Sequence, residues 1–160
     1  MIQKAFIKIN GIEGESRDLL HHGEIDVIRW RWRAEQALRK YKKDSNGLGL
    51  HTANGFVFEH YVDNSSQGML HYCTSGKHIP EAVLTINTAD GLPLSYLRIT
   101  LQEIVIINIQ SICYNTMHAP REKVELLFSR FMMDYVPQDK PGFSGRVVTI
   151  GYDVKSNQII

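Results

Sequence analysis

The stretch that decides the fold runs from Leu97 to Ile109 and has the sequence LRITLQEIVIINI. Over most of its length every second residue is apolar, which is the period of a β-strand. The opposite face begins polar and then turns apolar at Ile104 and Ile106. A strand that is apolar on both faces is covered on both. We therefore expect the cover over Ile104 and Ile106 to be a second layer of this chain or another subunit.

The same alternation recurs at both ends of the chain. Near the start, Ala5, Ile7 and Ile9 share one face and Lys4 and Lys8 the other, and residues 148–155 alternate in the same way. Residues 25–32 and 124–135 also alternate, but their apolar set changes side midway. Such a change indicates a bulge or a sharp twist. The sequence therefore predicts a mainly β fold, either a closed barrel or a tight sandwich.

The segment 65–76 breaks this rhythm. It begins with two serines, a residue type that caps free backbone amides, and it ends at Gly76, which supplies a left-handed stop. Apolar residues at helical spacing lie between them, so we expect a helix of two to three turns with Leu70 and Cys73 facing the barrel. Residues 33–43 fit both a helical stripe and a continued strand, and this choice stays open.

Length, charge and targeting signals narrow the class of protein. The 160 residues suffice for one domain, residues 1–160, and a formal net charge of +1 gives no global attraction to nucleic acid or to anionic membranes. Lysines interrupt the apolar residues at the start, unlike in a signal peptide, and no apolar stretch is long enough to cross a bilayer as a helix. We expect folding in the cytoplasm, no membrane insertion and no fused toxin domain after the last strand.

Residues that carry chemistry are present but form no recognisable site. The seven histidines lack the spacing of metal ligands. Cys73 and Cys113 are too few and too far apart for a disulfide framework, so we expect two buried thiols. Cys73, Ser75 and His78 match no nucleophile pattern, and no glycine-rich loop is suited to phosphates. The sequence predicts no catalytic residue, no metal, no cofactor and no enzyme activity.

A basic cluster gives the strongest argument for nucleic acid, because aromatic residues are interleaved with its charges. However, the alternation sends Trp30 and Trp32 to the face opposite the arginines, so these rings are expected to belong to the core. We therefore expect no nucleic acid as a partner, and a nucleic-acid-binding β-barrel remains a lesser alternative. The cluster comprises Arg29, Arg31, Arg33, Arg39, Lys40, Lys42 and Lys43.

Six segments, in this order, resemble the hemolysin-coregulated protein (Hcp) family over nearly the whole chain. The stretch from Cys73 to Leu84, CTSGKHIPEAVL, is the most specific of them. The others are FIKINGIEGES at 6–16, EIDVI with WRW at 24–32, YVD at 61–63, PLSYLRITL at 93–101 and YVPQ at 135–138. A chance match to all of these in order is implausible.

The resemblance implies a closed antiparallel β-barrel with one flanking helix, similar to phage tail tubes. In this family six copies close into a ring, and rings stack into the hollow inner tube of the type VI secretion system. A contractile sheath expels the tube, which carries a spike at its tip and can hold small effectors in its lumen. The expected partners are thus the chain itself, sheath and spike-tip proteins, and effectors. A free secreted ring acting as an adaptor is the alternative reading.

Three groups of residues are candidates for contacts within such a tube. Ile104 and Ile106 are candidates for contacts between subunits or between stacked rings. Arg29, Arg31 and Arg33 leave the tryptophan face together, and they line either a lumen that favours acidic cargo or a salt-bridge layer between subunits. Leu19 and Leu20 lie at the centre of a polar loop that is too long for a tight turn. Exposed leucines there suggest an anchor into a neighbouring subunit or ring; the alternative is that the two leucines fold back over the barrel's own end.

Overall fold

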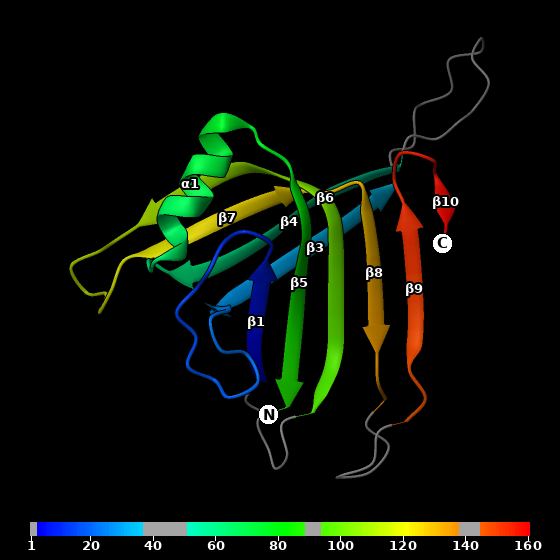
Figure 1. Cartoon of the computed structure of the whole chain (residues 1–160), viewed down its shortest axis with the longest axis horizontal. Helices are drawn as coiled ribbons and strands as arrows, with labels where there is room; N and C mark the ends of the chain where they lie inside the picture. The colour runs from blue at the N-terminus through cyan, green and yellow to red at the C-terminus, as the bar shows by residue number, and fades with distance from the viewer. Residues whose placement is uncertain (1–2, 37–50, 89–93, 138–144) are drawn as a thin grey trace.

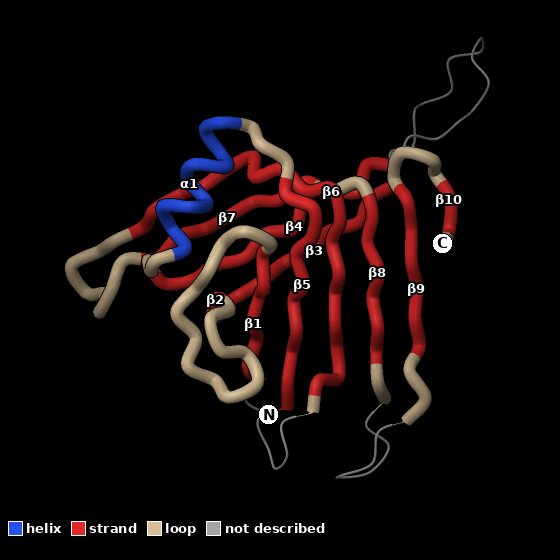
Figure 2. Tube along the Cα trace, in the orientation of Figure 1, coloured by secondary structure: helices blue, strands red, loops and turns tan. Residues whose placement is uncertain are grey.

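The computed structural model describes residues 3–36, 51–88, 94–137 and 145–160. Within these residues the chain forms ten β-strands and one α-helix, arranged as in Figure 1, and Figure 2 separates them from the loops. The prediction of a mainly β fold with one helix is confirmed. The elements are β1 (Gln3–Ile9), β2 (Ile25–Val27), β3 (Arg29–Gln36), β4 (His51–Tyr61), α1 (Ser65–Ser75), β5 (Ile79–Thr88), β6 (Ser95–Ile112), β7 (Arg121–Leu127), β8 (Arg130–Tyr135), β9 (Val148–Asp153) and β10 (Gln158–Ile159).

Two antiparallel sheets share the long strand β6. Sheet A has the order β10-β9-β8-β6-β5-β1-β2, and sheet B has the order β3-β4-β7-β6. Residues 95–104 of β6 pair within sheet A, whereas residues 105–112 pair with β7 of sheet B. In Figure 1 sheet B slants behind sheet A. The apolar core lies between the two sheets.

The inward face of β6 changes side at Glu103. Ile99 and Leu101 are buried before this residue, and Ile104 and Ile106 are buried after it, one residue out of phase. Glu103 absorbs the change with a φ of 52°, in the left-handed region that few non-glycine residues adopt. The strand is therefore not apolar on two faces at once. It has one core-facing side, which switches.

This switch corrects one prediction. Ile104 and Ile106 are 0% and 1% exposed and lie beside Ile79 and Leu126 of the same chain. Their second cover is the chain's own core, so they offer no surface to another subunit, and their prediction as inter-subunit contacts is wrong. The large apolar residue of this stretch that is exposed is Ile107, which stands at a bulge opposite β7.

The other two changes of side also occur where the chain passes between sheets. β2 belongs to sheet A and β3 to sheet B, and Ile28 between them donates its backbone N–H to the carbonyl of Glu59 over 2.8 Å. β7 of sheet B likewise leads into β8 of sheet A through residues 128–129. The predicted bends in both segments are thus confirmed as crossings between sheets.

Within the described residues, hydrogen bonds do not close the two sheets into a barrel. Among the described strands, β3 pairs with β4 alone and sheet A ends at β10. Side chains nevertheless meet across this gap, because Trp32 of β3 contacts Phe131 of β8 edge to face, with ring centroids 4.6 Å apart. The open side is therefore spanned by aromatic packing, and the closed barrel stays a prediction.

The helix α1 forms where the sequence predicted it. Gly76 adopts a left-handed conformation directly after its last turn, with a φ of 66°. At its start the acceptors of free amides are Asp63, which precedes the serines, and one of the serines, Ser66. The carboxylate of Asp63 accepts the backbone N–H of Ser65 over 2.9 Å, while Ser66 Oγ accepts the N–H of Asp63.

The buried stripe of α1 differs from the predicted one. Met69 is fully buried and Cys73, one turn later, packs against the core, whereas Leu70 is 54% exposed. The prediction that Leu70 faces the barrel is wrong, because adjacent helical residues point about 100° apart and Leu70 lies beside the inward stripe. The sequence left open whether residues 33–43 form a helix or a strand. Residues 33–36 continue strand β3, and residues 37–43 lie outside the described chain.

The turn after β9 is fastened by one carboxylate. Asp153 accepts Arg130 Nε over 2.6 Å with one oxygen, and with the other it accepts the backbone N–H groups of Ser156 and Lys155 over 3.0 and 2.9 Å. The bond from Ser156, followed by that from Arg130, holds the pKa of Asp153 below its usual range. The same pair raises the pKa of Arg130.

This pKa shift predicts a pH-dependent contribution of Asp153 to stability. A carboxyl group with a lowered pKa in the folded state stabilises above its unfolded pKa of about 4, and loses that effect as pH falls through the lower folded value. We expect Asp153→Asn to lower the melting temperature at pH 7, and the difference from the unaltered chain to vanish as pH falls from about 4 towards 2. The control is Asp26→Asn on an exposed position of β2. An equal loss at all pH values would contradict the assignment.

Candidate functional site

Strand β3 carries the predicted arginines on its outer face. Arg29, Arg31 and Arg33 are exposed, while Trp30 and Trp32 between them turn towards the core. Trp30 stacks on Phe56 of β4, with ring centroids 6.0 Å apart. The separation of arginines from tryptophans that the alternation predicted is confirmed. The remaining basic residues of the cluster, 39–43, lie outside the described chain.

The neighbouring strands continue this arginine face with charges of both signs. Arg29 pairs in register with Glu59 of β4 and donates to its carboxylate over 2.7 Å. Glu59 in turn lies opposite Lys123 of β7, and two residues away along β7 lies Glu125. We use the name "arginine face" for the outer side of sheet B formed by Arg29, Arg31, Arg33, Glu59, Arg121, Lys123 and Glu125.

Sequence reasoning identified one strand of this face and missed the others. Arg121, Lys123 and Glu125 alternate with the buried Val124 and Leu126, so their outward direction was readable from the sequence. What was not readable is that β7 lies next to β4, because strand pairing across some 60 residues leaves no local pattern. The face therefore carries more cations than carboxylates, and several of its charges come from outside the predicted cluster.

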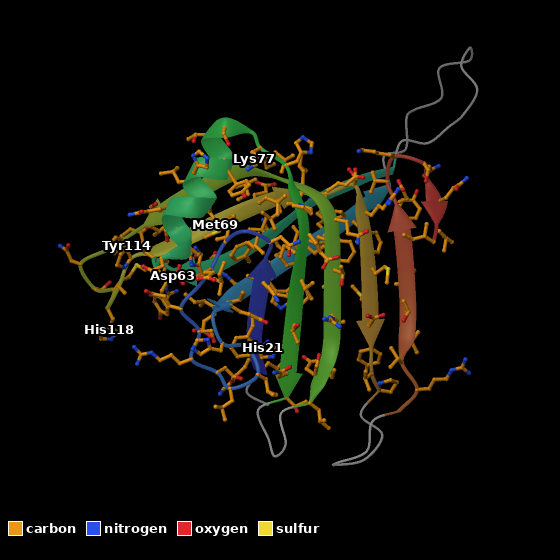
Figure 3. All side chains as sticks on the ribbon, viewed as in Figure 1. His21, Asp63, Met69, Lys77, Tyr114 and His118 are labelled. Atoms are coloured by element: carbon orange, nitrogen blue, oxygen red, sulfur yellow. The ribbon has the colours of Figure 1, made fainter. Side chains whose placement is uncertain are left out.

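A cavity of about 350 Å³ lies at one end of the arginine face. It is lined by Arg29 and Arg121, by the carboxylate of Glu59, and by Tyr114 and Met117 of the β6–β7 connection. The guanidinium of Arg121 also lies over the ring of Tyr61, 5.4 Å from its centroid. Figure 3 shows Tyr114 and His118 at the far end of that connection, away from the sheets. The cavity thus combines cations with an aromatic wall.

The loop between β1 and β2 lies on the outer side of sheet A and is held there by His21. The imidazole stacks on Phe6 of β1, with ring centroids 4.3 Å apart. Nδ1 donates to the Glu24 carboxylate over 2.9 Å, and Nε2 accepts the side-chain amide of Asn87 over 2.9 Å. Figure 3 places His21 in front of the sheet. The sequence showed His21 only as one of seven scattered histidines and did not predict this role.

Backbone contacts give the same loop its shape. Ser16 and Gly23 exchange strand-like hydrogen bonds with the residues opposite them. At Gly14 an added Cβ would lie 2.4 Å from the carbonyl oxygen of Glu24, so only glycine allows this close approach. The base of the loop is therefore fixed by packing and by hydrogen bonds.

The tip of the loop presents its leucines to solvent. Leu19 is 98% exposed and Leu20 is 63% exposed. The loop folds onto the sheet, but the two leucines do not fold back with it. Exposed leucines on a rigid loop are typical of a contact with another molecule. Their docking into a neighbouring subunit or ring stays a prediction.

Other kinds of site have no support among the described residues. They contain no group of three or more side chains placed to hold a metal ion. No helix in the described part of the chain is long and apolar enough to span a membrane. Cys73 is partly buried and Cys113 is exposed, both as free thiols, so the prediction of two buried thiols is wrong for Cys113. Its place just beyond the end of β6 explains this exposure.

A scan against family models places the chain by its sequence. Residues 6–135 match the model described as type VI secretion system effector, Hcp. The chain belongs to the Hcp family. It is 34% identical to the Hcp1 protein of Pseudomonas aeruginosa over 95% of both chains. The predicted resemblance is thereby confirmed.

Solved Hcp structures agree with the fold described above. The chain resembles the crystal structure of Hcp1 from Salmonella typhimurium with a TM-score of 0.84 and 37% identity, covering all of both chains. It resembles a type VI secretion system effector from Yersinia pestis with a TM-score of 0.76 and 32% identity, covering 93% of this chain and 98% of the other. Hcp proteins form rings of themselves and serve as secreted structural components of type VI secretion, and this chain is a tube and effector protein of that system.

Proposed function

We propose that six copies of this chain, each a single domain, form a ring of the type VI inner tube, with the arginine face of sheet B turned to the lumen. The observation that supports this orientation is the two-sided character of sheet B. One side buries Trp30 and Phe58 in the core, and the other presents charges to water. A sheet that forms the wall of an aqueous channel needs one apolar face towards the protein core and one hydrated face towards the channel.

The open edges of sheet B support the same arrangement. Among the described strands, β3 pairs only with β4, and the second half of β6 pairs only with β7. A four-stranded sheet with two free edges can be continued from copy to copy around a ring. Within each copy, the contact of Trp32 with Phe131 across the remaining gap supports the proposal that the domain acts as a closed barrel.

The charges of the arginine face suggest what the lumen holds. Arg29 is already paired with Glu59 of its own chain, so Arg31 is the better candidate to meet a partner. We propose that acidic surfaces of small effector proteins bind there. The competing role is a salt-bridge layer between subunits, in which Arg31 would meet a carboxylate of the next copy.

The route of the protein follows from the same role. We propose that the chain folds in the cytoplasm and leaves through the type VI apparatus without a cleaved signal peptide. Its further partners are then the contractile sheath around the tube and the spike at its tip. These proposals rest on family membership and on the lysines that interrupt the apolar residues of β1.

The ring is tested by the solution mass of the purified chain. We expect light scattering at two protein concentrations to give a mass near six chains of 18.3 kDa each, and negative-stain images of the same sample to show annuli in the absence of nucleic acid. A chain that remains monomeric even at high concentration would remove the tube as its function. It would favour instead the alternative function, a β-barrel that binds single-stranded nucleic acid through its basic cluster.

The role of Arg31 is tested by charge reversal. We expect Arg31→Glu to leave the ring intact and to reduce the amount of a co-expressed small acidic effector that co-purifies with it, by about tenfold, because attraction becomes repulsion at six positions. The control is Lys8→Glu, which reverses a charge on the outer side of sheet A. If rings fail to form instead, Arg31 belongs to a layer between subunits. If neither ring nor cargo changes, both roles are wrong.

The loop tip is tested by making it polar. We expect the double variant Leu19→Asp, Leu20→Asp either to form rings that no longer stack or to form no rings, because two charged side chains cannot enter an apolar contact with the next ring or with the neighbouring subunit. Its melting temperature should stay near that of the unaltered chain, since both leucines are exposed. Analytical ultracentrifugation separates single rings from stacks. Normal ring formation and stacking would remove the docking role of the loop.

A further inference from the structure

A groove of about 490 Å³ lies on the outer side of sheet A. Strands β1, β5 and β6 form its floor, and the loop between β1 and β2 forms one wall. Figure 1 shows this loop in front of β1. Small-molecule sites in proteins enclose about 300–1,000 Å³, so the groove has the size of a ligand site. The core separates it from the arginine face of sheet B.

The floor of the groove contains polar side chains that are almost completely buried. Thr85 and Asn87 of β5 face outward, because they alternate with Leu84 and Ile86 of the core. Outward side chains of a sheet normally reach water, yet Thr85 is 9% exposed and Asn87 is 2% exposed. A few buried polar groups that converge on one cavity are typical of a binding site.

Asn87 leaves one hydrogen-bonding atom without a partner. Its Nδ2 donates to His21 Nε2 over 2.9 Å. Its Oδ1 is buried and has no donor among the described residues. Buried acceptors of this kind are uncommon in folded proteins, because desolvation without a hydrogen bond is unfavourable. A ligand hydroxyl in the groove would supply the missing donor, and Thr85 adds a hydroxyl of its own to the same lining.

Two cations flank the floor from either side. Arg98 of β6 lies opposite Thr85, and Lys8 of β1 lies opposite Val83. Neighbouring strands are about 4.8 Å apart, so both long side chains can reach one group that lies above β5. Both are exposed and line the groove, and neither forms an ion pair within the described part of the chain. The groove thus offers two unpaired positive charges.

The two carboxylates of the groove already accept hydrogen bonds. Glu24 accepts His21 Nδ1 over 2.9 Å, and Glu81 accepts Gln102 Nε2 over 3.2 Å. They also offset the two cations, so the lining carries no large net charge. Such a lining favours a ligand with a single negative charge, such as a carboxylate. A phosphate monoester carries about two negative charges at neutral pH, and it would meet more repulsion from Glu24 and Glu81.

We propose that the groove binds a sugar acid, a molecule with one carboxylate and several hydroxyls. Its carboxylate accepts charge-assisted hydrogen bonds from Arg98 and Lys8. One of its hydroxyls donates to Asn87 Oδ1, and another meets the hydroxyl of Thr85. A simple acid without hydroxyls satisfies only the cations, and a neutral sugar satisfies only the orphan oxygen, so both functions are expected in one molecule.

The site is a property of the single chain and does not rest on the ring. In the proposed ring it lies on the far side of the core from the lumen, so it is separate from cargo binding. Six copies would present six such sites, and a polymer of sugar acids would engage several of them at once. The same chemistry therefore suits a free sugar acid and an acidic polysaccharide, which a short oligomer distinguishes.

The first test compares ligands that differ in one group. Saturation-transfer difference NMR observes the ligand and suits a single chain as well as a ring. We expect D-galacturonate to bind the purified chain about tenfold more tightly than D-galactose, which lacks the carboxylate, or acetate, which lacks the hydroxyls. Galactose 6-phosphate should bind more weakly than galacturonate. The proposal is overturned by equal binding of galactose or acetate, by tighter binding of the phosphate, or by no binding of galacturonate.

The second test locates the site with single substitutions. We expect Arg98→Gln to weaken galacturonate binding by about tenfold and Thr85→Val by about threefold, because the first loses a charge-assisted hydrogen bond and the second a neutral one. The matched control is Arg146→Gln, which removes an exposed arginine outside the groove. Circular dichroism and melting curves establish that all variants fold. An equal loss in the control, or no loss in Arg98→Gln, would contradict the site.

The source of the sugar acid is read from trigalacturonate. Its three units raise its affinity about threefold by number alone. A larger gain supports an acidic polysaccharide as the ligand, whereas a gain of threefold or less supports a free sugar acid. These results are independent of the ring. A chain that stays monomeric but binds galacturonate keeps the groove and loses the tube, and a ring that does not bind galacturonate keeps the tube and loses the groove.

Discussion

The burial of apolar side chains along β6 determines the rest of the structure, because this one strand belongs to both sheets. Its inward face must change side where the strand leaves sheet A and joins sheet B. Glu103 makes that change possible by adopting a backbone conformation that few residues other than glycine accept. Without it, either Leu101 or Ile104 would point into water, and each full burial of such a side chain is worth about 1.5–3 kcal/mol.

The position of the arginine face follows from this geometry. Once the second half of β6 and the strands β7, β4 and β3 form sheet B, their even spacing sends Trp30, Phe58 and Val124 inward and the charged residues outward. The loop before β2 is then fixed on the opposite side of the molecule by the stacking of His21 on Phe6. The charged face and the leucine tip are thus held apart by a single core, and neither depends on the other.

Local patterns in the sequence predicted where strands and the helix lie better than they predicted which strands lie next to each other. Alternation placed β1 and β3, and Gly76 marked the end of α1. The prediction for Ile104 and Ile106 was wrong because one alternation was extended through Glu103, whose conformation no local pattern reveals. Leu70 was misplaced because helical spacing gives a stripe but not which of two adjacent stripes meets the core. The partners of β3 required knowledge of strand order, which depends on contacts far apart in the chain.

The carboxylates among the arginines have a kinetic consequence. Exposed ion pairs are individually worth only about 0.2–1 kcal/mol, and Glu59 already occupies Arg29. A protein held by such a face would dissociate rapidly from any single subunit. In the proposed ring, six identical faces around a cargo protein would rebind it before it diffused away, so residence time would come from repetition rather than from strength. A tube built in this way would release its cargo when its rings dissociate, and no separate release step would be needed.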